Sequence, residues 1–266
     1  MYGLRFCCTC ETLQTETIKQ TNTMKIIAHR GASGYKPENT LAAFARAIEM
    51  HADMIELDVY QIKSGELVVI HDHSVRRTTN GRGKVEQFSL EDLRALDAGK
   101  GEKVPLLSEV IELVDKKMPI NIELKGSHTA EPVASLLKRY FAKGWSPEQF
   151  QISSFDHREV RRFMKHLPEV AAGALHNKRP FWLRPLSYHP RLATINFNQQ
   201  YVTYTEIALA HRLGKKVYVY TINSSTKARR MRALGVDGIF TNYPDILQAE
   251  IEPVASTDPA ENALPS

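Results

Sequence analysis

Two short segments of this sequence carry charged or polar side chains at alternate positions inside otherwise apolar runs. Glu56 and Asp58 lie in one segment, and Asn121, Glu123 and Lys125 alternate in the other. Because side chains two residues apart on a β-strand point to the same face, each segment would present these groups together. Three carboxylates that meet at one place repel one another unless a cation lies between them. Since no cysteine is close by in the sequence, the pattern favours a hard divalent ion, Mg²⁺ or Ca²⁺.

Each segment also has a simpler interpretation. Glu56 and Asp58 could be solvated acids at a strand end, although an uncompensated charge in an apolar run is costly. Glu123 and Lys125, taken alone, could be a structural ion pair. The presence of both segments in one chain favours the metal site.

Two histidines could move protons beside such a site. His29 closes one apolar run and His71 closes another. Phosphodiester cleavage needs one group to accept a proton from the attacking oxygen and another to give one to the leaving oxygen. Imidazole can do either at neutral pH. Arg30 and Lys125 would supply positive charge for a phosphate, and an arginine can bind it bidentately. His71 followed by Asp72 is also compatible with an ordinary turn.

These residues belong to a regular alternation of strand and helix patterns. Such an alternation predicts a parallel sheet, and eight repeats predict an α/β fold of the (β/α)8 TIM barrel type, whose active sites form at the C-terminal strand ends. The predicted strands are Lys25–His29, Met54–Tyr60, Ile120–Lys125, Phe150–Phe155, Val170–Leu175, Ala193–Phe197, Lys216–Thr221 and Gly238–Thr241. The predicted helices are Leu41–His51, Leu107–Lys117, Glu131–Lys143, His157–His166, Thr203–Leu213 and Ser225–Leu234, with Pro180–Tyr188 as a weaker candidate because it contains prolines.

One segment interrupts this repeat. Gly65 permits a tight turn after the second strand, and a glycine-rich stretch, residues 80–83, precedes a short helix pattern near Leu90–Leu96. We expect residues 62–104 to form a small insertion over the catalytic end of the barrel.

The two ends of the chain differ from the barrel in composition. Residues 1–23 are polar and threonine-rich without apolar periodicity, which predicts a disordered or mis-called extension before Met24. Residues 24–250 would form the barrel. Residues 251–266 are acidic and contain prolines, which predicts a flexible tail.

Composition limits the class of protein further. The 266 residues are 42% hydrophobic and 24% charged, which is globular, and the net charge of +5 suits an acidic small molecule, a membrane surface or nucleic acid. No basic patch interleaved with aromatic residues supports the last of these. All three cysteines lie in the first ten residues, and no apolar run has the length of a membrane span or a signal peptide. We therefore expect a cytoplasmic protein with a small-molecule substrate, no nucleic acid partner and no integral membrane segment.

From Met24 to about Leu247 the sequence resembles the glycerophosphodiester phosphodiesterase family, in the superfamily of phosphatidylinositol-specific phospholipase C-like phosphodiesterases. Each matching motif alone is weak, but their order and spacing together are specific. The motifs are His29-Arg30-Gly31, Pro37-Glu38-Asn39-Thr40, Glu56-Leu57-Asp58-Val59, Val68-Val69-Ile70-His71-Asp72, Arg77-Thr78-Thr79-Asn80-Gly81, Ile122-Glu123-Leu124-Lys125, Ser153-Ser154-Phe155 and Gly235-Val236-Asp237-Gly238-Ile239-Phe240-Thr241-Asn242-Tyr243-Pro244.

The resemblance implies a TIM barrel with a small insertion after the second strand, and metal-dependent hydrolysis of glycerophosphodiesters to sn-glycerol 3-phosphate and an alcohol. The relation to the phospholipases C suggests that the glycerol 2-hydroxyl attacks first, and that water then opens a cyclic phosphate. The implied roles are metal ligation by Glu56, Asp58 and Glu123, acid-base catalysis by His29 and His71, and phosphate binding by Arg30 and Lys125.

Further residues have less defined roles. Phe155 and Tyr220 are either substrate contacts or parts of the core, and the family usually has another aromatic, often tryptophan, at the position of Tyr220. Glu38 either orients a residue of the site or is solvated. For Asn39 and Thr40 the preferred interpretation is a helix cap, with Asn39 also a candidate supporting residue.

Two other functions fit the same residues. One is a lysophospholipase D or phospholipase D-like activity on acylated phosphodiesters, which would release lysophosphatidate instead of glycerol 3-phosphate. The other is a barrel that binds phosphodiesters without cleaving them. The presence of both histidines and all three carboxylates argues against the second.

Overall fold

The computed structural model describes residues 24–177 and 185–251, with side chains as far as residue 247. The predicted extension, residues 1–23, lies outside the described residues. So do all but the first residue of the predicted tail and the first part of the weak helix candidate at 180–188.

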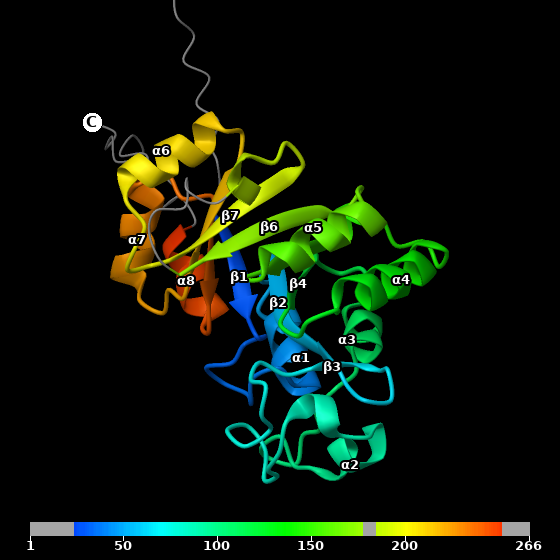
Figure 1. The fold of residues 1–266 in the computed structure, drawn as a ribbon. Helices are drawn as coiled ribbons and strands as arrows, with labels where there is room; N and C mark the ends of the chain where they lie inside the picture. Colours follow the sequence, from blue (N-terminus) through cyan, green and yellow to red (C-terminus); the bar gives the residue numbers. More distant parts are fainter. Residues whose placement is uncertain (1–23, 178–184, 252–266) are drawn as a thin grey trace, which may run out of the picture.

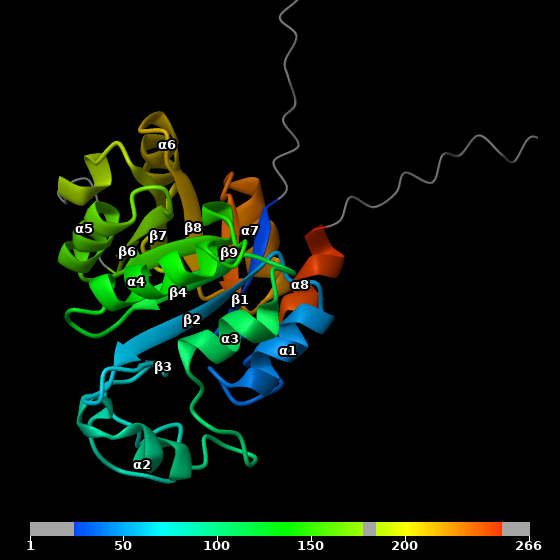
Figure 2. The same ribbon diagram turned by 90° about the vertical axis from the view of Figure 1, so that its right-hand side faces the viewer.

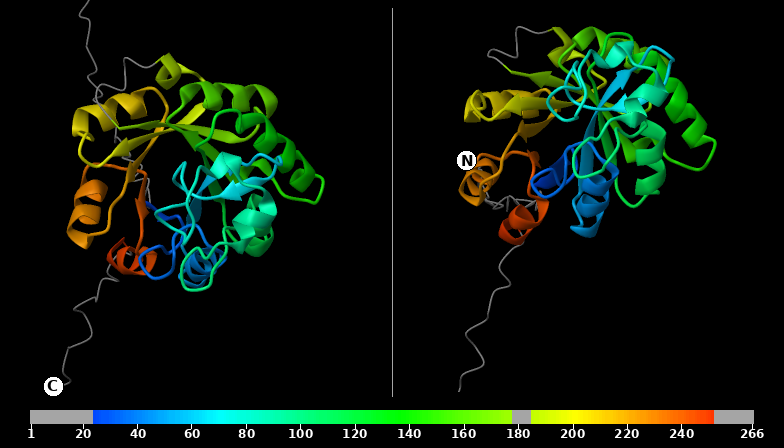
Figure 3. Two further views of the ribbon diagram at one scale, coloured as in Figure 1. Left: turned by 60° about the horizontal axis from the view of Figure 1, so that its bottom comes forward. Right: turned by 90° about the horizontal axis from the view of Figure 1, so that it is seen from below.

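Eight parallel strands close into a barrel, in the order β1-β9-β8-β7-β6-β5-β4-β2 with a further pairing of β2 to β1. Figure 3 shows the helices outside the ring of strands. The structure therefore has the predicted α/β architecture, a TIM barrel, and each strand boundary lies within one residue of its prediction. The strands are β1 Lys25–His29, β2 Met54–Gln61, β4 Ile120–Leu124, β5 Phe150–Ser154, β6 Ala171–His176, β7 Leu192–Asn198, β8 Lys216–Tyr220 and β9 Gly238–Thr241.

Helices follow most of these strands and pack on the outside of the barrel (Figure 1). The connection from β6 to β7 holds, in its described part, only a 3-10 turn, η4 Pro185–Tyr188. The helix at the end of the described chain, α8, was not predicted. The helices of the barrel are α1 Leu41–Glu49, α3 Leu107–Val114, α4 Ala130–Phe141, α5 His157–His166, α6 Tyr204–Arg212, α7 Ser225–Ala233 and α8 Pro244–Ile251, with a 3-10 turn η2 at Pro147–Gln149. None of the helices in the described ranges is both long enough and apolar enough to cross a membrane.

The strand alternation separates an apolar outer face from a largely polar interior, which also holds one small apolar cluster, Ile27, Met54, Tyr218 and Phe240. On β4, Ile120 and Ile122 belong to the apolar core under the helices. Asn121, between them, points into the barrel and donates from Nδ2 to Ser153 Oγ at 3.0 Å. On the next strands Gln151 Nε2 donates to Thr194 Oγ1 at 3.2 Å. A hydrogen-bonded polar layer thus lines the barrel interior, where buried charges at the strand ends find polar neighbours.

The predicted insertion begins with a short antiparallel strand, β3 Leu67–Val69, which pairs with the end of β2. The turn between them uses Gly65 at φ +101°, a conformation that residues with a Cβ rarely adopt. A 3-10 turn, η1 Val85–Gln87, and helix α2 Leu90–Ala95 follow. Figure 2 shows this segment beyond the end of β2. Its apolar core consists of Tyr60, Ile62, Val68, Ile70, Val75, Val85, Leu93, Ala98 and Val104.

Candidate active site

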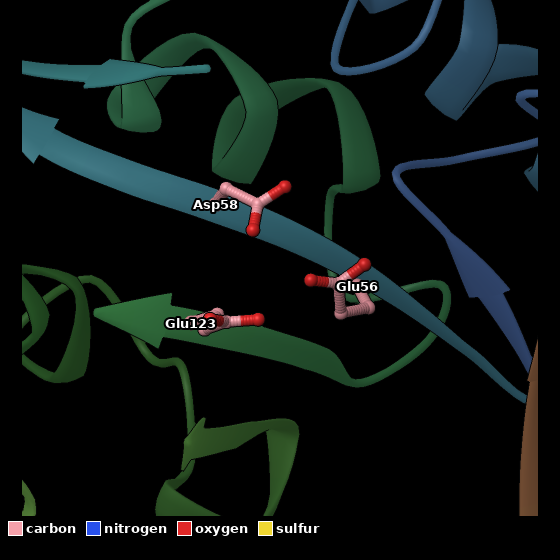
Figure 4. Close-up of side chains that lie close together, drawn as sticks. All are labelled: Glu56, Asp58 and Glu123. Carbon is pink, nitrogen blue, oxygen red and sulfur yellow. The ribbon is translucent and has the colours of Figure 1, made fainter. Parts of the chain in front are cut away.

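Strand register brings the predicted carboxylates together. Asp58 of β2 lies opposite Glu123 of β4, and Glu56 lies between Asn121 on one side and His29 of β1 on the other. Glu56, Asp58 and Glu123 are 2%, 0% and 8% exposed. Each offers a carboxylate oxygen within 4.8 Å of the other two. Figure 4 shows the three groups pointing toward one another across the two strands.

Burial of these acids makes their ionisation costly. Burial, with repulsion from Asp58, raises the pKa of Glu56 well above its usual range and that of Glu123 to about 7. Lys125 Nζ lies 2.8 Å from Glu123 Oε1 and 3.7 Å from Asp58 Oδ1. Arg30 Nε lies 3.4 Å from Asp58 Oδ2. Two cations thus offset three acids only in part, and a divalent cation would supply the missing positive charge.

The donor atoms fit such an ion. Among the described residues, Asp58 Oδ1 and Asn121 Oδ1 are buried oxygens without a hydrogen-bond partner. Burying an oxygen that accepts no hydrogen bond costs free energy unless a ligand or ion binds that oxygen. A set of carboxylate and amide oxygens suits Mg²⁺ or Ca²⁺, which prefer oxygen ligands.

Residues 30 and 38–40 hold the carboxylates in place. Asn39 Nδ2 donates to Asp58 Oδ2 at 2.8 Å, and the Arg30 backbone N–H donates to Glu56 Oε2 at 2.9 Å. Thr40 caps α1 by accepting from the backbone of Ala43. Of the two residues predicted for the helix cap, Thr40 therefore is the cap, while the Asn39 side chain bonds Asp58.

Glu38 links two arginines at the edge of this cluster. It accepts from Arg30 Nη1 at 2.8 Å and from both terminal nitrogens of Arg77, at 2.8 and 2.7 Å. Burial alone would raise the pKa of Glu38, but the bonds from Arg77 and Arg30 lower it to about 2. Glu38 is thus a charged member of the site and orients the Arg30 guanidinium.

Gly31 allows the backbone after β1 to approach helix α1 closely. At φ +78°, a Cβ on this residue would lie 2.6 Å from the backbone carbon of Ala43 in α1. The glycine therefore lets the loop after β1 pack on α1, which fixes the position of Arg30.

His29 enters the site from the end of β1. Its Nδ1 lies 2.8 Å from Asn242 Oδ1, an acceptor, so Nδ1 carries the proton and Nε2 has the lone pair. Burial, followed by the charge of Arg30, lowers the pKa of His29 to about 4. The imidazole is therefore neutral at physiological pH.

His71 is placed by the insertion. The Ile70 N–H donates to the carbonyl of Asp58 at 2.9 Å, which positions the next residue beside the carboxylates. His71 Nδ1 lies 2.5 Å from Asp72 Oδ1, and Lys125 Nζ lies 3.2 Å from His71 Nε2. Because a carboxylate only accepts and an ammonium only donates, Nδ1 carries the proton and Nε2 presents its lone pair. Burial lowers the pKa of His71, although the charge of Asp58 opposes this effect.

Sequence reasoning did not assign roles to the partners of the two imidazoles. Asp72 binds His71, and Arg77 Nε in turn donates to Asp72 Oδ2 at 2.6 Å, which helps hold the pKa of Asp72 well below its usual range. Asn242 orients His29 from a distance of 213 positions. All three residues lie in matching motifs, but only the fold shows what they touch.

Two cavities open beside these groups. The smaller cavity, of about 140 Å³, is walled by Phe155 and Tyr220, whose rings meet edge to face at 5.9 Å. The Tyr220 hydroxyl donates to the carbonyl of His176, so the ring is fixed. The smaller cavity is lined by His29, Arg30, Glu56, His71, Asn121, Glu123, Ser153, Phe155, Leu175, Tyr220, Thr221 and Phe240. The larger cavity, of about 650 Å³, is lined by Tyr60, His71, Asp72, His73, Ser74, Arg76, Arg77 and Lys125.

Comparison with known proteins gives consistent matches along the barrel. Residues 29–246 match the model of the glycerophosphoryl diester phosphodiesterase family. The chain is 38% identical over 233 residues to the glycerophosphodiester phosphodiesterase of Caldanaerobacter subterraneus. This match covers 84% of this chain and 95% of that protein. It is 36% identical over 238 residues to the enzyme of the same name from Bacillus altitudinis, and this match covers 83% of this chain and 95% of that protein.

Solved structures agree with these sequence matches. A phosphodiesterase from Oleispira antarctica, solved in complex with the product sn-glycerol-3-phosphate, superposes with a TM-score of 0.78 at 29% identity. The match covers 86% of this chain and 97% of that one.

Proposed function

The chain belongs to the glycerophosphoryl diester phosphodiesterase family, and we propose that it hydrolyses glycerophosphodiesters to sn-glycerol 3-phosphate and an alcohol at the site described above. The observation that carries this proposal is the meeting of the three buried carboxylates with two imidazoles that line one cavity. The relative from Oleispira antarctica with bound sn-glycerol-3-phosphate supports the same product.

Charge complementarity suggests how the substrate binds. The phosphate would lie between Arg30 and Lys125, which flank the carboxylates and carry the nearest positive charges. The glycerol would enter the smaller cavity against Phe155 and Tyr220. A divalent ion held by Glu56, Asp58 and Glu123, either Mg²⁺ or Ca²⁺, would polarise the phosphoryl oxygens and offset their charge.

The imidazoles would then move protons. Both carry their proton on Nδ1, and Nε2 of His71 accepts from Lys125, which must turn to the phosphate before that nitrogen is free. One imidazole can then accept the proton of the glycerol 2-hydroxyl at Nε2 as that oxygen attacks phosphorus. The other, which takes up a proton from solvent at Nε2 before the reaction, gives that proton to the leaving alkoxide as the P–O bond breaks. The resulting cyclic phosphate is opened by water with the proton transfers reversed. Asp72 supports this role because its carboxylate stabilises a protonated His71.

Product analysis tests the proposal. The purified full chain with added Ca²⁺ or Mg²⁺ would be offered glycerophosphocholine and lysophosphatidylcholine in parallel, while glycerol 3-phosphate is followed with a coupled dehydrogenase. We expect glycerol 3-phosphate from the first substrate. Lysophosphatidate from the second, without glycerol 3-phosphate from the first, would instead identify a lysophospholipase D. If the protein cleaves neither of these substrates nor any other diester, the alternative of a non-catalytic barrel that binds phosphodiesters is supported.

A cytoplasmic location is also a proposal, supported by the absence of cysteine from residues 11–266. Fractionation of native cells would test it, and recovery of the protein outside the cytoplasmic fraction would contradict it.

A further inference from the structure

The larger cavity adjoins the smaller cavity through His71, which lines both. Lys125 lines the larger cavity and bonds Glu123, which lines the smaller one. A phosphate held between these residues would therefore face both cavities. One ester arm of the substrate would extend into each.

Size decides which arm goes where. The smaller cavity, of about 140 Å³, has room for about five water molecules, which matches a three-carbon glycerol unit but not a whole diester. The larger cavity, of about 650 Å³, lies within the usual range for small-molecule sites, about 300–1,000 Å³. The leaving alcohol would therefore occupy the larger cavity.

The lining of the larger cavity carries more positive than negative charge. It contributes three permanent cations, Arg76, Arg77 and Lys125, and one acid, Asp72. Arg77 is bound by Asp72 and Glu38, and Lys125 by Glu123. Glu86 lies near Tyr60 but does not line the cavity.

Arg76 differs from the other two cations. Its side chain is exposed, and within the described ranges its guanidinium has no carboxylate within ion-pair distance. The chain thus places an uncompensated guanidinium on the wall of the cavity proposed for the alcohol. Guanidinium binds phosphate and carboxylate groups bidentately and repels ammonium groups.

The geometry points to a preference for glycerophosphodiesters whose alcohol carries an additional anionic group, with Arg76 as the residue that recognises it. This inference rests on the proposed function and adds the class of head group. Diesters with a quaternary ammonium alcohol are the disfavoured class, because the same positive wall opposes them.

The test uses the full-length protein at low salt and compares its kcat/KM for three diester substrates. Glycerophosphoinositol 4-phosphate and glycerophosphoinositol differ by one anionic group, and glycerophosphocholine carries a cation. We expect the phosphorylated substrate to exceed its unphosphorylated counterpart by about fivefold or more, as for a charge-assisted hydrogen bond at an accessible site. Glycerophosphocholine should be the slowest of the three. The differences should shrink as salt is raised, because exposed charges are screened.

Arg76→Gln should remove most of the preference for the additional phosphate. Arg82→Gln is the matched control, since Arg82 is also an exposed arginine of the insertion but does not line the cavity. It should leave all three values unchanged within about twofold. Equal kcat/KM for the three substrates, fastest turnover of glycerophosphocholine, or an unchanged preference in Arg76→Gln would overturn the inference while leaving the proposed function intact. Failure to release glycerol 3-phosphate from any diester would overturn the proposed function itself, and this inference with it.

Discussion

Binding of Ca²⁺ or Mg²⁺ at the three carboxylates should weaken as pH falls below about 7, and Glu123 sets the size of the effect. Burial and the neighbouring Asp58 raise its pKa from 4.5 to about 7. A cation that binds this carboxylate must displace its proton, so the apparent Kd is multiplied by one plus the ratio of protonated to ionised carboxyl. Between pH of about 8 and about 6 this factor grows about tenfold, or about 1.4 kcal/mol. Glu56, whose pKa is also raised, acts in the same direction.

Isothermal titration calorimetry on chelator-stripped protein measures this effect directly. Titrations at pH of about 6, 7 and 8, in two buffers of different ionisation enthalpy, give both the Kd and the number of protons released. Glu123→Gln should weaken binding and reduce both the pH dependence and the proton release. Glu91→Gln, an equal charge change on the exposed face of α2, is the control and should change neither. A Kd that stays constant within about twofold across this range would refute the reasoning.

Three further changes test other parts of the site. His29→Ala or His71→Ala should each lower kcat by about 10²–10⁴, the range for a proton-transfer group, without unfolding the protein, and steady-state kinetics with a melting curve would show it. Wild-type turnover in either variant would contradict its role. Asp72→Asn should lower kcat by about 10–100-fold, as for outer partners that orient an imidazole, and an unaltered pH-rate profile would count against it. Deletion of residues 1–23 should leave kcat and Tm unchanged, because that segment is polar and has no apolar periodicity in its sequence. A clear loss of either would show that the segment belongs to the fold.

The barrel could be predicted because its strands are short apolar runs of regular spacing. Placing Glu56, Asp58 and Glu123 together needed only the two-residue strand period and the parallel neighbours of a barrel. Helix α8 was missed because Pro244–Ile251 has only a weak apolar periodicity, whereas α3, which has the same length, has a strong one. The helix boundaries differ by up to three residues because the last turns end in locally determined caps, such as the left-handed Asp115 after α3.

The residues that hold the predicted site side chains in place could not be predicted, since their roles depend on tertiary contacts. Asn39 looked like a helix cap in sequence, and only the packing of the loop after β1 shows its side chain on Asp58. Asn242 reaches His29 because β9 pairs with β1 at the closure of the barrel. The salt-bridge network around Glu38 joins Arg30 to Arg77 of the insertion, which lies 39 positions from Glu38, a contact that no local pattern encodes.

A crystal structure with Mn²⁺ and sn-glycerol 3-phosphate tests the central claim most directly, because anomalous scattering locates the ion independently of the protein. The account predicts one Mn²⁺ bound by Glu56, Asp58 and Glu123, with the phosphate between Arg30 and Lys125 and the glycerol against Phe155 and Tyr220. An ion bound elsewhere, or a phosphate out of reach of both His29 and His71, would contradict it.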